Sequence, residues 1–176
     1  MSHKKTGREA TKHRDDLTGE HRLGDAGQLI LFLAFLAVWI TDSFFFKYSI
    51  FLNNYIPLAV QIPLGVIILI IAGYLAKTGM TIVFGEVREE PGVIRKGVFG
   101  IIRHPVYMSE ILLYLGLLFL STSLAAIGVW IVVIAFLHYI SRHEEKLLLE
   151  RFGDEYRQYM KDVPMYIPRF RRRKRK

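Results

Sequence analysis

The feature that most constrains this chain is the grouping of its apolar residues into four long blocks separated by charged stretches. The blocks cover approximately residues 28–46, 56–76, 105–120 and 124–140. A bilayer core ~30 Å thick needs about 20 such residues in a helix, so the last two blocks must extend into the interface or thin the bilayer locally. The chain is 52% hydrophobic yet carries a net charge of +8. This segregation predicts an all-α integral membrane protein with about four transmembrane helices.

The distribution of Lys and Arg predicts the orientation of these helices. Six lie in residues 1–25, one in 47–55, five in 77–104, none in 121–123 and twelve from residue 141 onward. Cytoplasmic loops are enriched in Lys and Arg, so the alternation predicts a multi-pass protein with both termini on the cytoplasmic side. The N-terminal segment has no short apolar core before a small-residue cleavage site, so we expect no cleaved signal peptide.

The short turn at 121–123 forces the last two blocks into an antiparallel helical hairpin. Pro105 suits the first turn of the first helix of this hairpin, and Ser123 is a suitable N-cap for its second helix. Pro105 and Ile140 lie equally far from the turn, at ~25 Å for a rise of ~1.5 Å per residue. The hairpin therefore brings "RHP" at 103–105 beside "HYISRHEEKLL" at 138–148.

Polar side chains meet where these two stretches meet. The last helix continues past the apolar block through Glu144 and Glu145 to Gly153, a typical C-terminal cap. Acidic pairs on exposed helices are usually just solvated, but the hairpin places this pair beside a cationic tripeptide, which predicts a polar pocket at the membrane surface. Glu110 lies inside an apolar block, where a carboxylate is costly, and is a further functional candidate unless it is paired or shallow.

Two flanking segments complete the predicted pocket. The 77–104 connection is long and glycine-containing, which is typical of a lid or binding segment. After Gly153, apolar and aromatic residues at helical spacing predict a short amphipathic helix, which we expect on the membrane surface. The basic tail, 169–176, favours cytoplasmic placement and contact with anionic membrane lipids. No groove-reading or base-stacking module accompanies this tail, so we expect no nucleic-acid partner.

The predicted organisation has four parts: a polar segment at 1–25, helices 1–2 within 26–76, a catalytic region at 77–168 and the basic tail at 169–176. The chain has no cysteine, which excludes disulfides, thiolate metal ligands and a cysteine nucleophile. Histidines suitably spaced for a metal are also too few, so no metal centre is expected.

Two motifs carry a family resemblance. "GVIRKGVFGIIRHPVY" at 92–107 and "EEKLLLERFGDEYRQYMKDVPMYIP" at 144–168, one hairpin apart, resemble the isoprenylcysteine carboxyl methyltransferase family, whose wider clan includes phospholipid N-methyltransferases. The resemblance covers about residues 91–168. It implies a membrane enzyme that holds S-adenosyl-L-methionine at the cytoplasmic end of the hairpin and methylates a lipid-like or lipidated acceptor. The cofactor-binding residues that it implies are Gly92, Val93, Ile94, Phe99, His104, Pro105, Val106, Tyr107 and Glu144.

The chain departs from the family pattern at two positions. Phe99 stands where many members have tyrosine, which removes a hydroxyl from the implied cofactor site. Ile140 stands where eukaryotic members have a substrate-binding arginine. Arg103 and Arg142 are the remaining candidates for binding the substrate, and no residue is assigned a catalytic role. The nucleophile of the acceptor, a carboxylate, an amine or a thiol, stays open.

Methyl transfer from a sulfonium is an in-line displacement that needs alignment and exclusion of water rather than a metal. Two alternatives remain. Membrane sterol reductases share an "RHPxY"-like segment but use NADPH, and the acidic pattern after the last block favours the methyltransferase over them. A non-catalytic membrane anchor would bind no cofactor and would tolerate substitution of His104 and Glu144.

Overall fold

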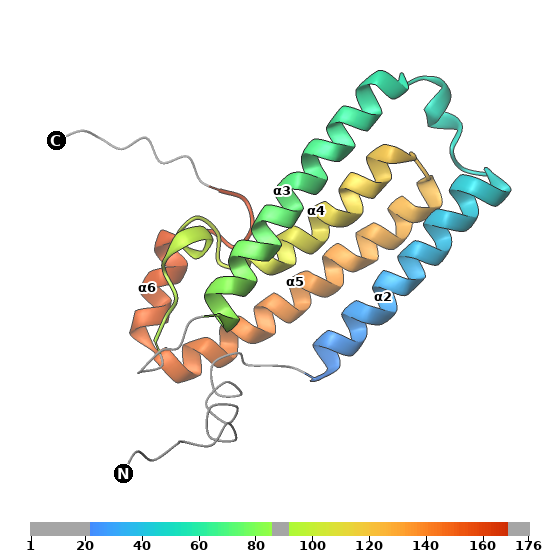
Figure 1. Cartoon of the computed structure of the whole chain (residues 1–176). Helices are drawn as coiled ribbons and strands as arrows, with labels where there is room; N and C mark the ends of the chain where they lie inside the picture. The colour runs from blue at the N-terminus through green and yellow to red at the C-terminus, as the bar shows by residue number, and fades with distance from the viewer. Residues whose placement is uncertain (1–21, 86–91, 169–176) are drawn as a thin grey trace, which may run out of the picture.

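The computed structural model describes residues 22–85 and 92–168, and this part of the chain is helical with no strand (Figure 1). The predicted N-terminal segment up to residue 21 and the basic tail lie outside the described residues. The long elements are α2 (Arg22–Ile40), α3 (Leu58–Phe84), α4 (Pro105–Leu120), α5 (Leu124–Phe152) and α6 (Asp154–Asp162). Three short elements are the π-helical η1 (Thr41–Phe46) and the 3₁₀ turns η2 (Phe51–Asn54) and η3 (Gly97–Gly100).

The helix lengths confirm an all-α membrane protein. Three helical segments are long and apolar enough to cross a bilayer: Gly24–Phe46, Leu58–Phe84 and Leu124–Phe152. The remaining apolar block, 105–120, forms α4, whose 16 residues extend ~24 Å, which is less than a ~30 Å hydrocarbon core. The bundle therefore combines three long helices with one short helix.

The helices pack in two pairs. Helix α4 packs most extensively against α3, and α2 packs against α5 (Figure 1). A Cβ atom on Gly116 would lie 2.7 Å from the Leu69 side chain and 3.2 Å from the Gly65 carbonyl oxygen. Small residues at this crossing let the two backbones approach closely, as is common between membrane helices. The α3–α4 pairing was not predicted from the sequence.

The predicted helical hairpin is confirmed, as are its caps. The Ser123 hydroxyl accepts a hydrogen bond from the Ala126 N–H at 3.1 Å, which makes Ser123 the N-cap of α5. Pro105 is the first residue of α4. Gly153 ends α5 with a φ of +54°, and its N–H donates to the Leu149 carbonyl at 2.9 Å. The positive φ explains the glycine at this bend.

A polar network closes the end of the bundle where η1, η2 and the α4–α5 turn meet, which we call the turn end. Asp42 is buried there and accepts hydrogen bonds from the backbone N–H groups of Tyr48 at 3.1 Å and Ser49 at 3.0 Å. The hydroxyls of Ser49 and Ser123 donate to its other oxygen, each at 2.5 Å. Both carboxylate oxygens of Asp42 therefore have donors.

Aromatic packing fills the interior between α2, α4 and α5. The Phe35 and Tyr114 rings are fully buried and meet edge to face, with their centroids 4.6 Å apart. The Tyr114 hydroxyl donates to the Glu110 carboxylate at 3.1 Å. Glu110 thus has a partner within its own helix.

The predicted amphipathic helix is present as α6, and its apolar side chains pack against other parts of the chain. Tyr156, Tyr159 and Val163 are buried in a second hydrophobic cluster. Their neighbours in this cluster are Val93, Leu148, Leu149, Phe152 and Met160. The bend at Gly153 turns α6 back onto the end of α5 and the 92–99 loop, and the position of α6 at the membrane surface stays a prediction.

Candidate functional site

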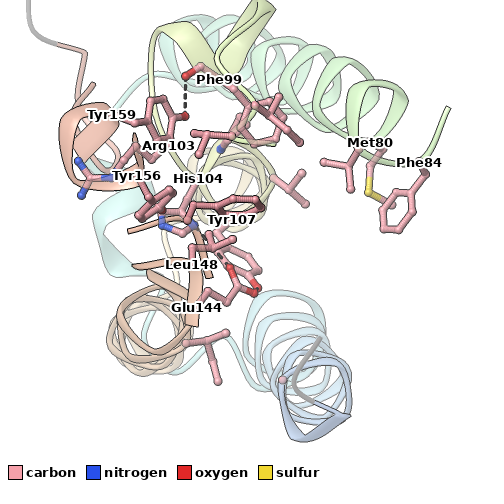
Figure 2. Close-up of a pocket in the computed structure, with 18 of the residues that line it drawn as sticks. Met80, Phe84, Phe99, Arg103, His104, Tyr107, Glu144, Leu148, Tyr156 and Tyr159 are labelled. Atoms are coloured by element: carbon pink, nitrogen blue, oxygen red, sulfur yellow. Dashed lines mark hydrogen bonds and ion pairs between the residues drawn. The ribbon is translucent and has the colours of Figure 1, made fainter. Parts of the chain in front are cut away.

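A cavity of about 430 Å³ lies at the other end of the bundle, which we call the site end. Its walls come from the start of α2, the end of α3, the 92–99 loop, the start of α4, and parts of α5 and α6 (Figure 2). The charged and polar side chains of the cavity lie beside apolar ones such as Leu148 and Phe152. The site end therefore offers a concave surface of mixed character, as small-molecule sites usually do.

All nine residues that the resemblance assigns to a cofactor line this one cavity. They are Gly92, Val93, Ile94, Phe99, His104, Pro105, Val106, Tyr107 and Glu144. Arg103 also lines the cavity, whereas Arg142 is exposed on α5 and is not among the lining residues. Their binding roles stay predictions, but two regions far apart in the sequence, 92–107 and the part of α5 around Glu144, do meet at the end of the hairpin.

Two glycines let the cavity-lining segments approach α3. Gly97 has a φ of +57°, and a Cβ atom on it would lie 2.7 Å from the Ile82 side chain. A Cβ atom on Gly79 would lie 2.9 Å from the side chain of Val106. The loop before α4 and the first turn of α4 are thereby held close to the end of α3. This contact fixes the position of the residues that follow, His104 and Tyr107.

The His104 imidazole lies between two carboxylates. Its Nε2 is 3.3 Å from Glu145 Oε1, and its Nδ1 is 3.7 Å from Glu144 Oε2. The Tyr107 ring stacks on the imidazole with centroids 5.7 Å apart, and the Tyr107 hydroxyl donates to Glu144 Oε1. Burial lowers the pKa of His104 below its usual range although Glu145 opposes the shift, so the ring is neutral near pH 7.

Arg103 is engaged by groups of the chain itself. Its side chain is only 8% exposed, and its Nε and Nη2 atoms lie 2.7 and 2.6 Å from Glu145 Oε1. Its Nη1 donates to the carbonyl oxygens of Met160 at 3.1 Å and Val163 at 2.5 Å. A buried ion pair with this many additional hydrogen bonds ties α5 to the end of α6.

The segment after α6 is tied to the same tripeptide through the backbone. The N–H groups of Arg103 and His104 donate to the carbonyl oxygens of Pro164 at 2.9 Å and Met165 at 3.2 Å. The Tyr159 hydroxyl donates to the Phe99 carbonyl at 2.7 Å (Figure 2). Burial raises the pKa of the Tyr159 hydroxyl, so it remains a neutral donor. These bonds hold α6, whose Tyr156 and Tyr159 line the cavity, against the stretch that contains Phe99, Arg103 and His104.

Several cavity residues were not predicted from the sequence. They are Gly24, Asp25 and Gln28 from α2, and Met80, Val83 and Phe84 from α3. A topological signal was available, because the predicted topology puts the start of the first apolar block and the end of the second on the same side of the membrane as "RHP". The charged Asp25 directly before an apolar block was a second signal.

The arrangement suits a ligand that has both polar and apolar parts. Glu144 and His104 offer acceptors for N–H or O–H groups, and Leu148 and Phe152 offer apolar contact. Met80 and Phe84 line the cavity and are also 47% and 39% exposed on the outer surface of α3. The cavity thus adjoins the apolar outer surface of the bundle.

Comparison with known proteins gives one match. A family model described as phospholipid methyltransferase matches residues 54–155, which is more than half of the 176 residues. The matched range contains α3, α4 and α5 and ends just after α6 begins, whereas α2 precedes it. A search of curated proteins found no match to the chain.

Proposed function

Because the chain belongs to the phospholipid methyltransferase family, we propose that it is an S-adenosylmethionine-dependent methyltransferase that acts on a lipid-like or lipidated acceptor at the cytoplasmic face of a membrane. The observation that carries the proposal is the convergence of nine residues on one cavity. These residues come from the loop before α4, the start of α4 and the distal part of α5. The family resemblance of the two sequence motifs assigns each of them to the cofactor.

The residues around the cavity fit S-adenosylmethionine. The volume of about 430 Å³ lies within the range of roughly 300–1,000 Å³ that is usual for small-ligand sites. The Glu144 carboxylate is suited to an ammonium group or to ribose hydroxyls, and its side chain is 19% exposed, towards the cavity it lines. Leu148 and Phe152 are suited to the less polar parts of the same molecule.

When bound, S-adenosylmethionine supplies an electrophilic methyl group on a sulfonium. The chain contributes binding, orientation and exclusion of water. Tyr107 holds the Glu144 carboxylate through a hydrogen bond, and the wall formed by Tyr156 and Tyr159 limits access of water from the α6 side. Holding two reactants in line supplies a large part of the rate enhancement in a displacement of this kind.

An acceptor with an apolar chain is supported by the position of the cavity. Met80 and Phe84 form part of its wall and are exposed on the outer surface of a helix long enough to span a bilayer. A lipid-like molecule can therefore reach the cavity from the membrane, with a carboxylate, amine or thiol as its nucleophile. The Lys and Arg distribution supports a cytoplasmic site end, where the water-soluble cofactor is available.

Ligand titration of the detergent-purified full chain tests the proposal. We expect micromolar binding of S-adenosylmethionine and S-adenosylhomocysteine by calorimetry, and at least tenfold weaker binding in His104→Ala and Glu144→Ala. The matched control is Glu150→Ala, an exposed residue of α5 that does not line the cavity. Binding of NADPH alone would favour a reductase, and a folded protein that binds none of these ligands would favour a non-catalytic anchor.

A further inference from the structure

The orientation of the His104 ring is fixed from several sides. Tyr107 stacks on it at 13°, and the Tyr166 ring lies 6.0 Å away on a different segment of the chain. Tyr166 is in turn held by hydrogen bonds of its hydroxyl with Ser141 at 2.6 Å and the Leu137 carbonyl at 3.2 Å. A ring packed in this way presents one nitrogen to each of the two carboxylates.

The partner of Nε2 determines which nitrogen carries the proton. Glu145 is 2% exposed, and its Oε1 atom already accepts from the Arg103 guanidinium. A carboxylate in an ion pair only accepts hydrogen bonds, so the His104 nitrogen at 3.3 Å must be the donor. A neutral imidazole has a single N–H group, and therefore Nδ1 has a free lone pair.

The lone pair on Nδ1 faces a second hydrogen-bond acceptor, Glu144 Oε2, and neither of these two atoms donates to the other. Nδ1 lies 3.7 Å from Glu144 Oε2, which exceeds hydrogen-bond distance, while Glu144 Oε1 accepts from Tyr107. Both His104 and Glu144 line the cavity. Two neighbouring acceptors of this kind are complementary to an N–H group of a ligand, and most strongly to a cationic one, because hydrogen bonds to ionised donors are the stronger ones.

We propose that Glu145 is a positioning residue that fixes His104 as the Nε2–H tautomer, so that His104 Nδ1 and Glu144 Oε2 form an acceptor pair for an ammonium group of the ligand. The identity of the ligand rests on the proposed function: the ammonium belongs either to S-adenosylmethionine or to an aminolipid acceptor. Glu145 lies outside the cavity lining and acts through His104. Arg103 supports it by pairing with the same carboxylate oxygen.

The tautomer can be measured without any ligand. In the full chain labelled with ¹⁵N-histidine, we expect a pyrrole-type signal for His104 Nε2 and a pyridine-type signal for Nδ1 at pH 7.5, assigned with His104→Asn. Glu145→Gln, whose amide can donate to Nε2, is expected to give a mixed or reversed tautomer. An Nδ1–H tautomer or an imidazolium in the wild type, or an unchanged tautomer in folded Glu145→Gln, would overturn the proposal.

Two controls separate positioning from a purely structural role. Glu150→Gln makes the same chemical change on the exposed side of α5 and should leave the His104 signals unchanged. Arg103→Lys keeps a cation beside Glu145 but loses the links to Met160 and Val163, and it should retain the tautomer. Loss of the tautomer in Arg103→Lys would show that the tie to α6, rather than Glu145, orients the ring. If Glu145→Gln fails to fold, the spectra of the wild type and of Arg103→Lys still test the proposal.

Binding measurements identify the source of the ammonium. Glu145→Gln should weaken S-adenosylhomocysteine about tenfold, the loss expected for one charge-assisted hydrogen bond. If the ammonium is that of the cofactor, an analogue of S-adenosylhomocysteine without the amino group should bind the wild type and Glu145→Gln equally. If Glu145→Gln binds S-adenosylhomocysteine and its analogue as tightly as the wild type does, its affinity for phosphatidylethanolamine in nanodiscs should be tenfold weaker instead. Unchanged affinity for both S-adenosylhomocysteine and phosphatidylethanolamine would reject the acceptor pair. A wild type that binds no S-adenosylmethionine would overturn the proposed function, whereas the tautomer would still be tested by the spectrum.

Discussion

The two ends of the bundle use the same kinds of groups in opposite ways. At the turn end, Asp42 is buried and both of its oxygens accept hydrogen bonds from the chain. At the site end, Glu144 lines the cavity, and its Oε2 atom lies 3.7 Å from His104 Nδ1, beyond hydrogen-bond distance. A saturated carboxylate contributes to stability, whereas one with free acceptor capacity is available to a ligand.

The largest expected effect is loss of stability in Asp42→Ala. The substitution leaves two backbone N–H groups and the hydroxyls of Ser49 and Ser123 without an acceptor. Four donors that lose their acceptor, most of them partly buried, should cost about 3 kcal/mol of unfolding free energy. Thermal unfolding in detergent, followed by tryptophan fluorescence, measures the change.

The comparison predicts that this loss stays separate from ligand binding. Asp42→Ala, at a temperature where it is folded, should bind S-adenosylhomocysteine with an affinity close to that of the wild type, because the turn end lies at the opposite end of the bundle from the cavity. An unchanged unfolding temperature would show that the Asp42 network does not support the fold.

The converse effect is expected for Glu144→Gln. The amide can still accept the hydrogen bond from Tyr107, so the unfolding free energy should change by less than about 1 kcal/mol. Loss of the negative charge should weaken binding of S-adenosylmethionine about 30-fold, equivalent to about 2 kcal/mol. Calorimetry and thermal unfolding on the same samples test both halves, and a large loss of stability with intact binding would reverse the assignment of the two ends.

A smaller effect concerns pH. Burial lowers the pKa of His104 in the folded protein below the usual value of 6.5. The unfolded chain therefore takes up a proton that the folded chain refuses, so this contribution to stability is complete above about pH 6.5 and is lost as the pH falls below it. Between pH 7.5 and 5.5 the loss should be about 1 kcal/mol.

The His104→Asn variant isolates this contribution from that of the other histidines. Its unfolding temperature should fall less between pH 7.5 and 5.5 than that of the wild type, because asparagine does not titrate. Parallel curves for the two proteins would mean that His104 has the same proton affinity in both states.

The site end was more predictable from the sequence than the rest of the fold. The turn at 121–123 is short enough to dictate a hairpin, and a hairpin has one register, so His104 and Glu144 had to meet. Ser123 and Gly153 mark helix ends through local hydrogen bonds and backbone geometry. Such features depend on residues close in sequence or on a single short connection.

The remaining features depend on packing between distant segments. Two examples are the close approach of Gly65 to Gly116 and the burial of α6. The hydrophobic periodicity of a helix shows that it has an apolar face, but it does not show whether that face contacts lipid or protein. The hydrogen-bond network of Asp42 could not be predicted because it includes Ser123, which lies 81 residues away in the sequence. Glu144 and Glu145 are adjacent in the sequence. Only the structure shows that Glu144 lines the cavity whereas Glu145 pairs with Arg103.

The smallest expected effect would sharpen the description of the site end. Phe99 lines the cavity and stands where many relatives of the resembled family have tyrosine. Phe99→Tyr adds a hydroxyl to the wall of the proposed cofactor site, which should tighten binding of S-adenosylmethionine about threefold, equivalent to the lower range for one hydrogen bond. The backbone carbonyl of Phe99, which accepts from Tyr159, is unaffected, so the unfolding temperature should not change. Weaker binding in calorimetry would mean that the ring packs against the ligand as an apolar surface, and the loop before α4 would then belong to the apolar rather than the polar part of the cavity.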